Sequence, residues 1–365
     1  MDRTKIGIIG CGNISKIYCE APDKFPNIEV VACADLDLDR ARAKAAEHGI
    51  PKALSVDDLL ADPDVEIAVN LTIPAVHAAV SRRVLEAGKH VYSEKPLATN
   101  RDDAAALLAL AREKNLRVGS APDTFLGAGL QTCRQLIDAG LIGEPVAATG
   151  AMQSRGPEGW HPDPEFFYQP GAGPMFDMGP YYLTALTSLL GPVRRVTGSA
   201  RTSFPERTIG SKAKLGQTIK VNTHTHIAGV LDFAAGAVAT LITSFDVHGG
   251  APFIEIYGSE ASLAVPDPNT FGGPVGLRRP GGKTFEEQPL AFPYDTNVRG
   301  IGVAEMAAAL RGERPHRASG EMAFHVLDLM VAFHEASAAG RHIDLGSTME
   351  RPAAFPSDLK AGSVG

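Results

Sequence analysis

The residues best suited to chemistry begin with a glycine-rich turn, residues 10–15 (GCGNIS), which follows a short apolar segment and opens a helical pattern. Gly10 permits a tight turn, Gly12 lets the backbone approach a phosphate closely, and the small Ser15 lets the helix pack near a sheet. The helix N-terminus offers free N–H groups and a positive dipole end to an anion. The turn residues expected to contact a dinucleotide are Gly10, Gly12, Asn13, Ile14 and Ser15.

An acidic residue, Asp35, ends the next apolar segment, about 20 residues after the turn. A carboxylate there accepts hydrogen bonds from the ribose hydroxyls of NAD and repels a 2′-phosphate. The following residues, Leu36 and Asp37, supply no cation that would hold such a phosphate. We therefore predict NAD, with NADP less favoured, and place Asp35 and Leu36 at the cofactor. The alternative is an ordinary glycine turn and a surface aspartate.

A third apolar segment ends at Thr72-Ile73-Pro74, and a helical pattern containing His77 follows. Ligands of open α/β sheets bind at the carboxyl ends of the strands. We expect Thr72, Ile73 and Pro74 to contact the cofactor, with the proline ring on the nicotinamide side. For His77 the sequence leaves two interpretations: a cofactor contact, or a first-turn helix residue without a ligand.

The segment Glu94-Lys95-Pro96 ends a fourth apolar strand. A lysine at the carboxyl end of a strand, beside a bound dinucleotide, is well placed to hydrogen-bond a substrate hydroxyl. The positive nicotinamide of NAD⁺ disfavours the ammonium form of Lys95, which would let the lysine accept a proton. Glu94 is expected at the same cofactor edge. The alternative is a solvated lysine that merely ends a strand.

The elements that must position these residues alternate between strand and helix patterns over about 120 residues, which is typical of βαβ units. Apolar strands separated by amphipathic helices predict a doubly wound parallel sheet covered on both faces. The expected strands are 5–10, 28–35, 65–72, 90–94 and 117–121. The expected helices start near residue 13 and at 37–48, 75–87 and 100–114.

Beyond residue 122 the pattern changes to consecutive strands with few helices between them, which predicts an α+β domain with a mostly antiparallel sheet. We therefore divide the chain into a dinucleotide-binding domain, 1–122, and a second domain, 123–365, for substrate binding and oligomerisation. The expected strands are 146–154, 193–204, 221–233, 237–246, 252–257 and 261–265. The expected helices are 129–139, 302–311 and 320–339.

Several segments together resemble the Gfo/Idh/MocA family of sugar and inositol dehydrogenases. The resemblance is carried by GCGNIS, by ACAD ending at Asp35, by TIPAVH at 72–77 and by AGKHVYSEKPLA at 87–98. LIDAGLIGEPV at 136–146 and GAGPMFDMGPYYL at 171–183 extend it over nearly the whole chain. It implies a Rossmann domain followed by an α/β domain with a large open sheet, homodimers or homotetramers, and NAD(P)-dependent oxidation of a secondary alcohol on a carbohydrate ring, or the reverse reduction.

The resemblance also implies a catalytic set, because the family lysine acts with an Asp and a His of an Asp-x-Gly-x-His segment. Lys95 and Asp177 match, and Tyr181 stands at the histidine position. A phenol near a lysine can relay a proton, so we assign Lys95, Asp177 and Tyr181 to catalysis and substrate binding. Two alternatives stay open: Tyr181 only shapes the pocket, and Asp177 only caps a helix.

Further substrate contacts are expected from a Gly- and Pro-rich segment between residues 153 and 173. It carries Trp160, the only tryptophan, and His161. An aromatic face that stacks on a sugar ring is a common recognition device. Asp123 follows the fifth strand, where it is expected to face the nicotinamide or the substrate.

Composition excludes several other classes. The formal charge is −7, and basic clusters are no longer than Arg82-Arg83 and Arg278-Arg279, so we expect no nucleic-acid partner. No stretch approaches the about 18 apolar residues of a membrane span. The start of the chain lacks the apolar core of a signal peptide, and the four cysteines show no CxxC spacing, so we expect a cytoplasmic protein without a metal.

We therefore predict an oxidoreductase that moves a hydride between a secondary alcohol of a sugar, glycoside or inositol and NAD. The first alternative is an NAD-dependent enzyme of the same family that cleaves glycosides by transient oxidation and elimination. A dihydrodiol- or biliverdin-reductase type of specificity, and an NAD-responsive regulator without chemistry, are the others. Net NADH formation separates the dehydrogenase from the glycoside-cleaving enzyme.

Overall fold

The computed structural model describes residues 3–365 and forms two compact units. The first unit runs to Gln131 and also contains Ala291–Leu327 and Pro352–Gly365, and the second comprises Thr132–Leu290 and Asp328–Arg351. Two C-terminal segments thus pack with the first unit, whereas the sequence places everything after residue 122 in one domain. The domain boundary at residue 122 stays a prediction.

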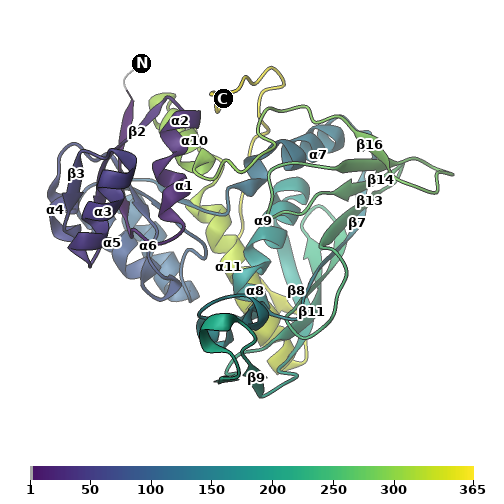
Figure 1. The fold of residues 1–365 in the computed structure, drawn as a ribbon. Coiled ribbons are helices and arrows are strands. Elements are labelled where there is room, and N and C mark those ends of the chain that lie inside the picture. Colours follow the sequence, from purple (N-terminus) through teal and green to yellow (C-terminus); the bar gives the residue numbers. More distant parts are fainter. Residues whose placement is uncertain (1–2) are drawn as a thin grey trace. The chain divides into compact units, whose positions relative to one another are not determined.

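The first unit is built on a six-stranded sheet in the order β3-β2-β1-β4-β5-β6. Its strands β2 and β3 are labelled in the purple N-terminal part of Figure 1. Every neighbouring pair is parallel, so all carboxyl ends meet at one edge of the sheet. This is the strand order of a Rossmann fold, and it confirms the predicted doubly wound sheet. The strands are β1 (Thr4–Ile9), β2 (Ile28–Ala34), β3 (Lys52–Leu54), β4 (Ile67–Asn70), β5 (His90–Ser93) and β6 (Val118–Ser120).

Most helices of this unit follow their predicted positions, with local departures, but the helix Val56–Ala61 is not among the predicted elements. The helix expected near Asn13 is two short helices, and Pro22 lies in the first turn of the second one. Strand β3 was not predicted, because its three residues are only half-buried and carry no apolar run. The helices are α1 (Ser15–Cys19), α2 (Ala21–Lys24), α3 (Leu38–His48), α4 (Val56–Ala61), α5 (His77–Glu86), α6 (Arg101–Glu113) and α10 (Ile301–Arg311).

The second unit contains a nine-stranded sheet in the order β16-β15-β14-β13-β7-β12-β11-β8-β17. Its pairs are antiparallel except β7 with β12, which confirms the predicted mostly antiparallel sheet. The strands are β7 (Pro145–Gln153), β8 (Val193–Arg201), β11 (His226–Phe233), β12 (Val238–Ser244), β13 (Phe253–Gly258), β14 (Ser262–Val265), β15 (Val275–Arg278), β16 (Glu286–Gln288) and β17 (Ile343–Asp344). A separate two-stranded sheet pairs β9 (Glu206–Thr208) with β10 (Thr218–Lys220).

Helices pack on this sheet where small residues make room for them. Gly198 and Gly229 face each other across β8 and β11, and a Cβ atom at Gly229 would lie 2.4 Å from the ring of Phe333. Phe333 belongs to α11 (Gly320–Ala339), whose bounds agree with the prediction. The remaining helices are α7 (Ala128–Asp138), α8 (Gly173–Asp177) and α9 (Gly179–Leu190). No helix within residues 3–365 is long and apolar enough to cross a membrane.

Candidate active site

The turn after β1 leaves space for a ligand at its second glycine. Gly10 has φ of 101°, and a Cβ atom there would lie 2.8 Å from the backbone of Leu71, so only glycine fits. A Cβ atom at Gly12 would meet nothing within 4 Å. The buried Ser15 hydroxyl donates a hydrogen bond of 2.6 Å to the Gly12 carbonyl oxygen, which fixes the turn at the start of α1. The turn therefore has the open backbone that a pyrophosphate requires.

The Asp35 carboxylate is held at the end of β2 by backbone donors. Its Oδ2 accepts from the Cys11 N–H at 2.8 Å, and its Oδ1 accepts from the Asp37 N–H at 3.0 Å. Arg40, which no sequence pattern indicated, has its guanidinium 3.6 Å from Asp35 Oδ1, because Asp37 caps α3 and brings the first turn back toward β2. A cation therefore does lie beside Asp35. Leu36, next in the chain, is 99% exposed.

The loop after β4 is held in place by hydrogen bonds of two buried side chains, Asn70 and His77. Asn70 accepts from the Thr72 N–H and hydroxyl, and its amide donates to the His77 carbonyl oxygen at 3.0 Å. The ring of His77, which is 1% exposed, lies 2.8 Å from the Thr72 carbonyl oxygen and 2.7 Å from that of Pro96. His77 thus joins this loop to the loop after β5, and its cofactor contact stays a prediction. Ile73 and Pro74 lie exposed at the tip.

The lysine turn after β5 is held from within the same unit. Glu94 accepts a hydrogen bond of 2.8 Å from the buried Tyr18 hydroxyl, and its other oxygen accepts from the Lys95 N–H at 3.0 Å. The Lys95–Pro96 peptide bond is cis, and the Lys95 side chain is half-buried. Glu94 therefore positions the lysine backbone. Tyr18 and Asn70 are supporting residues that the sequence analysis missed, although each is a polar group within an apolar pattern.

These groups fit a dinucleotide. All of them follow the carboxyl ends of parallel strands, where such cofactors bind. The open space at Gly12 suits a pyrophosphate, the Asp35 carboxylate suits ribose hydroxyls, and the exposed apolar side chains suit the two flat ring systems. These exposed side chains are Ile14, Leu36, Ile73 and Val76.

Asp123 occupies a different environment from the one expected. Its carboxyl group is 1% exposed, and Oδ2 accepts hydrogen bonds from the Gly300 N–H at 2.9 Å and the Gly302 N–H at 3.0 Å. Burial raises the pKa of Asp123 to about 6, although both N–H donors act in the opposite direction. Asp123 therefore holds the N-terminus of α10, and the substrate contact assigned to it stays a prediction.

Asp177 and Tyr181 lie four residues apart on a nearly continuous helical segment. Asp177 is the last residue of α8, Met178 keeps a right-handed helical backbone, and Tyr181 lies in the first turn of α9. Residues four apart on a helix share a face, and both side chains are half-buried. Met178, not Asp177, precedes α9, so the capping alternative for Asp177 is wrong. Their catalytic roles stay predictions.

The segment that carries Trp160 and His161 is anchored by a buried ion network. Arg207 Nη1 lies 3.0 Å from Asp246 Oδ1, and its Nε donates to Glu158 at 2.9 Å. The Tyr168 hydroxyl also donates to Glu158. Above this anchor Trp160 is 70% exposed, with its ring edge-on to that of His161. The exposed indole is available to stack on a flat apolar surface.

The histidines of β11 and its approach bind neighbouring side chains. His226 Nδ1 lies 2.9 Å from the Ser244 hydroxyl, and His224 Nδ1 lies 2.9 Å from His334 Nδ1, with the two rings stacked. Burial, and next the neighbouring His224, lower the pKa of His334 to about 4. Across residues 3–365 no group of three or more His, Cys, Asp or Glu is arranged to hold a metal ion.

The chain matches two family models. Residues 4–121 match the oxidoreductase family with an NAD-binding Rossmann fold, and residues 130–264 match the GFO/IDH/MocA C-terminal domain. The chain belongs to the Gfo/Idh/MocA family. It is an NAD-dependent oxidoreductase, and the family expected from the sequence motifs is confirmed.

The similarity to relatives with a named activity extends over most of the chain. The chain is 27% identical to 1,5-anhydro-D-fructose reductase of Ensifer adhaerens, over 93% of this chain and 98% of that protein. It is 30% identical to dTDP-3,4-didehydro-2,6-dideoxy-alpha-D-glucose 3-reductase of Streptomyces violaceoruber, over 87% and 90%. Levoglucosan dehydrogenase in complex with NADH and levoglucosan shares the fold, with a TM-score of 0.80 and 20% identity over 94% of this chain and 99% of that one.

Proposed function

We propose that this protein interconverts a secondary alcohol and a ketone on a pyranose-type ring, with NAD as the redox partner. The observation that carries the proposal is Lys95, a half-buried lysine on the turn after β5, at the sheet edge that also presents Gly12 and Asp35. NAD, when bound, accepts or supplies the hydride. The names of the relatives, a reductase of 1,5-anhydro-D-fructose and a dehydrogenase of levoglucosan, support a cyclic sugar as the substrate class.

The chain's own residues then have separate tasks. In the oxidative direction Lys95 accepts the proton of the reacting hydroxyl, and in the reductive direction it returns that proton to the ketone oxygen. Glu94 holds the Lys95 N–H and keeps the lysine turn in place. Asp177 binds a neighbouring hydroxyl, and Tyr181 relays the proton from the position where the family resemblance implies a histidine. General-base assistance of this kind contributes about 100- to 10,000-fold.

Substrate recognition is assigned to Trp160 and His161 together with Asp177 and Tyr181. The exposed Trp160 indole provides an apolar face for the C–H side of a ring, while carboxylate and phenol groups bind its hydroxyls. The anchored segment beneath Trp160 supports this assignment, because a binding group must be held in a fixed position.

We further propose a cytoplasmic homodimer or homotetramer. The four cysteines are free thiols, which suits a reducing compartment. Size-exclusion chromatography with light scattering tests the assembly, and a monomer at micromolar concentration would contradict it.

The test of the activity is a panel assay in both directions. Levoglucosan, L-sorbose, myo-inositol and aryl glycosides are each incubated with NAD⁺, and 1,5-anhydro-D-fructose with NADH. We expect net NADH formation, or NADH consumption, with at least one cyclic sugar. Aglycone release without net NADH would instead assign the glycoside-cleaving reaction, and no turnover with binding of NAD alone would favour a regulator.

A further inference from the structure

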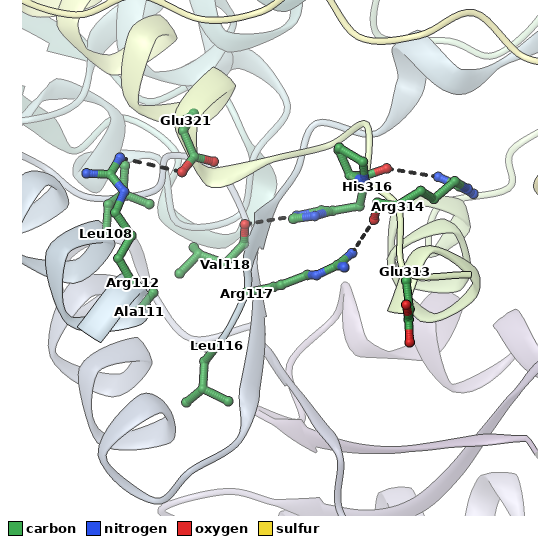
Figure 2. A pocket seen from close by; sticks show the side chains of 11 residues that line it. Leu108, Ala111, Arg112, Leu116, Arg117, Val118, Glu313, Arg314, His316 and Glu321 are labelled. Carbon is green, nitrogen blue, oxygen red and sulfur yellow. Dashed lines mark hydrogen bonds and ion pairs between the residues drawn. The ribbon is translucent and has the colours of Figure 1, made fainter. Parts of the chain in front are cut away.

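A cavity lies in the first unit at the edge of its sheet opposite to the dinucleotide edge. Arg117 immediately precedes β6, so it marks the amino end of that strand, whereas the dinucleotide edge carries the carboxyl ends. The cavity has a volume of about 380 Å³. Its walls come from α6, the start of β6, the turn after α10 and the first turn of α11 (Figure 2). The cavity is therefore separate from the site described above.

The walls are tied together across chain segments that lie far apart in the sequence. The Arg117 guanidinium donates to the Arg314 carbonyl oxygen at 2.6 Å, and His316 Nε2 lies 3.0 Å from the Val118 carbonyl oxygen (Figure 2). Gly119 and Ser319 add a backbone bridge beside them. These links order the cavity before any ligand arrives, which lowers the entropic cost of binding.

The cavity has an excess of positive charge, since its walls carry three arginines and two glutamates. Arg314 shares the buried carboxylate of Glu305 with Arg317, at 2.5 Å and 2.7 Å, so one negative charge serves two arginines. Arg112 is only loosely paired, 3.6 Å from Glu321. Within residues 3–365 Arg117 has no carboxylate within ion-pairing distance. Arg117 is thus a half-buried cation whose charge no acidic side chain balances at close range.

Burial and neighbouring arginines lower the pKa values of two groups at this end of the sheet. Burial, and next Arg314, lower the pKa of Arg117. Burial, and next Arg117, lower the pKa of His90 to about 4, and its Nδ1 accepts a hydrogen bond from the Arg117 N–H. A cation in this position gains from any anion that reaches it. Glu313 also lines the cavity but is exposed and forms no ion pair with Arg117.

We propose that this cavity binds a small organic oxyanion, a phosphate monoester or a carboxylate, with Arg117 as the principal contact and Arg112 as the second. A guanidinium fork matches the geometry of both anion types and forms charge-assisted hydrogen bonds. Part of the remaining wall is apolar, which suits an anionic group carried on a compact body of a few carbon atoms. This apolar part consists of Leu108, Ala111, Leu116, Val118 and Pro315.

Isothermal titration calorimetry of the full chain, saturated with NAD, tests the proposal. The probes are inorganic phosphate, glycerol 3-phosphate and malonate, with glycerol as the uncharged control. We expect one saturable site for at least one oxyanion, and the preferred probe distinguishes phosphate from carboxylate. Arg117→Gln should weaken binding about tenfold or more, as expected for loss of a charge-assisted pair, and Arg117→Lys should weaken it less.

Two further variants keep the test decisive. Lys114→Gln removes an exposed charge that does not line the cavity, and it should leave the affinity unchanged. Arg112→Gln changes an exposed side chain and keeps the protein folded even if Arg117→Gln does not, and it should also weaken binding. Absence of binding for all three oxyanions, or equal affinities in wild type and both arginine variants, would overturn the proposal. The calorimetric measurement needs no turnover, so absence of oxyanion binding and absence of the proposed activity are separate results.

Discussion

The buried carboxyl group of Asp123 should make the free energy of unfolding of the first unit depend on pH. The substitution Asp123→Asn should remove this dependence. Burial raises the pKa of Asp123 from 3.8 to about 6 in the folded protein. A group with a raised pKa favours folding below its unfolded pKa and loses that contribution as pH rises through the folded value. At 1.36 kcal/mol per pKa unit, the contribution amounts to roughly 3 kcal/mol, lost between about pH 4 and pH 6.

Asp123→Asn removes the titration while keeping an oxygen that can accept from the Gly300 and Gly302 N–H groups. The wild type should therefore lose roughly 3 kcal/mol relative to the variant between pH 4 and pH 7. The difference in stability between wild type and variant must be used, because His90 is present in both. The pKa of His90 is lowered to about 4, so its contribution to stability rises with pH, opposite to that of Asp123. Asp358→Asn, at an exposed position of the same unit, is the matched control.

Hydrogen-exchange mass spectrometry of peptides covering 291–311 is the suitable assay. The single tryptophan, Trp160, lies in the second unit, so its fluorescence does not report on this region. At each pH the intrinsic exchange rates are alike for the two proteins, so the difference in protection reports the stability difference. A wild-type-minus-variant difference that stays constant from pH 4 to pH 7 would refute the reasoning.

Three more predictions concern the cofactor edge and the second unit. His77→Phe should destabilise the fold by roughly 1–3 kcal/mol, measured by thermal unfolding, because the carbonyl oxygen that accepts the ring N–H, of Thr72 or of Pro96, loses its donor; an unchanged melting temperature would contradict the bridging role. Asp35→Ser should weaken NAD binding about tenfold or more in a fluorescence titration, and equal affinities would remove Asp35 from the site. Tyr181→Phe should lower kcat about 100-fold with little change in KM if the phenol relays the proton, and an unchanged kcat would assign it to pocket shape alone.

The parts of the fold that the sequence predicts well are those with strong periodicity. Helix α11 and the central strands of both sheets carry long apolar patterns, and the predicted positions of these elements agree with the structure. Strand β3 and the edge strand β16 are three residues each with little apolar burial, so no pattern indicated them. Short edge strands depend on their neighbours and not on their own sequence.

In the candidate site, too, some residues are predictable from the sequence and others are not. The residue types of Gly10, Gly12 and Asp35 follow from what a dinucleotide requires, and the structure brings them to one sheet edge. The supporting contacts do not follow from spacing, since Tyr18 reaches Glu94 across 76 positions in the chain. The position of Asp123 after a strand predicts a contact with the nicotinamide or the substrate. The partners of Asp123, Gly300 and Gly302, lie 177 and 179 positions further along the chain, so no local sequence pattern indicates the contact.

The most direct test of the central claim is a single-turnover measurement of hydride transfer with Lys95→Met. The enzyme, loaded with NAD⁺ or NADH as the direction requires, is mixed with the panel sugar that turns over fastest, and the change in NADH absorbance is followed. Lys16→Met, an exposed lysine on α1, is the control. We predict that Lys95→Met slows hydride transfer about 100- to 10,000-fold while NAD affinity stays close to that of the wild type. Hydride transfer at the wild-type rate in Lys95→Met would contradict the account.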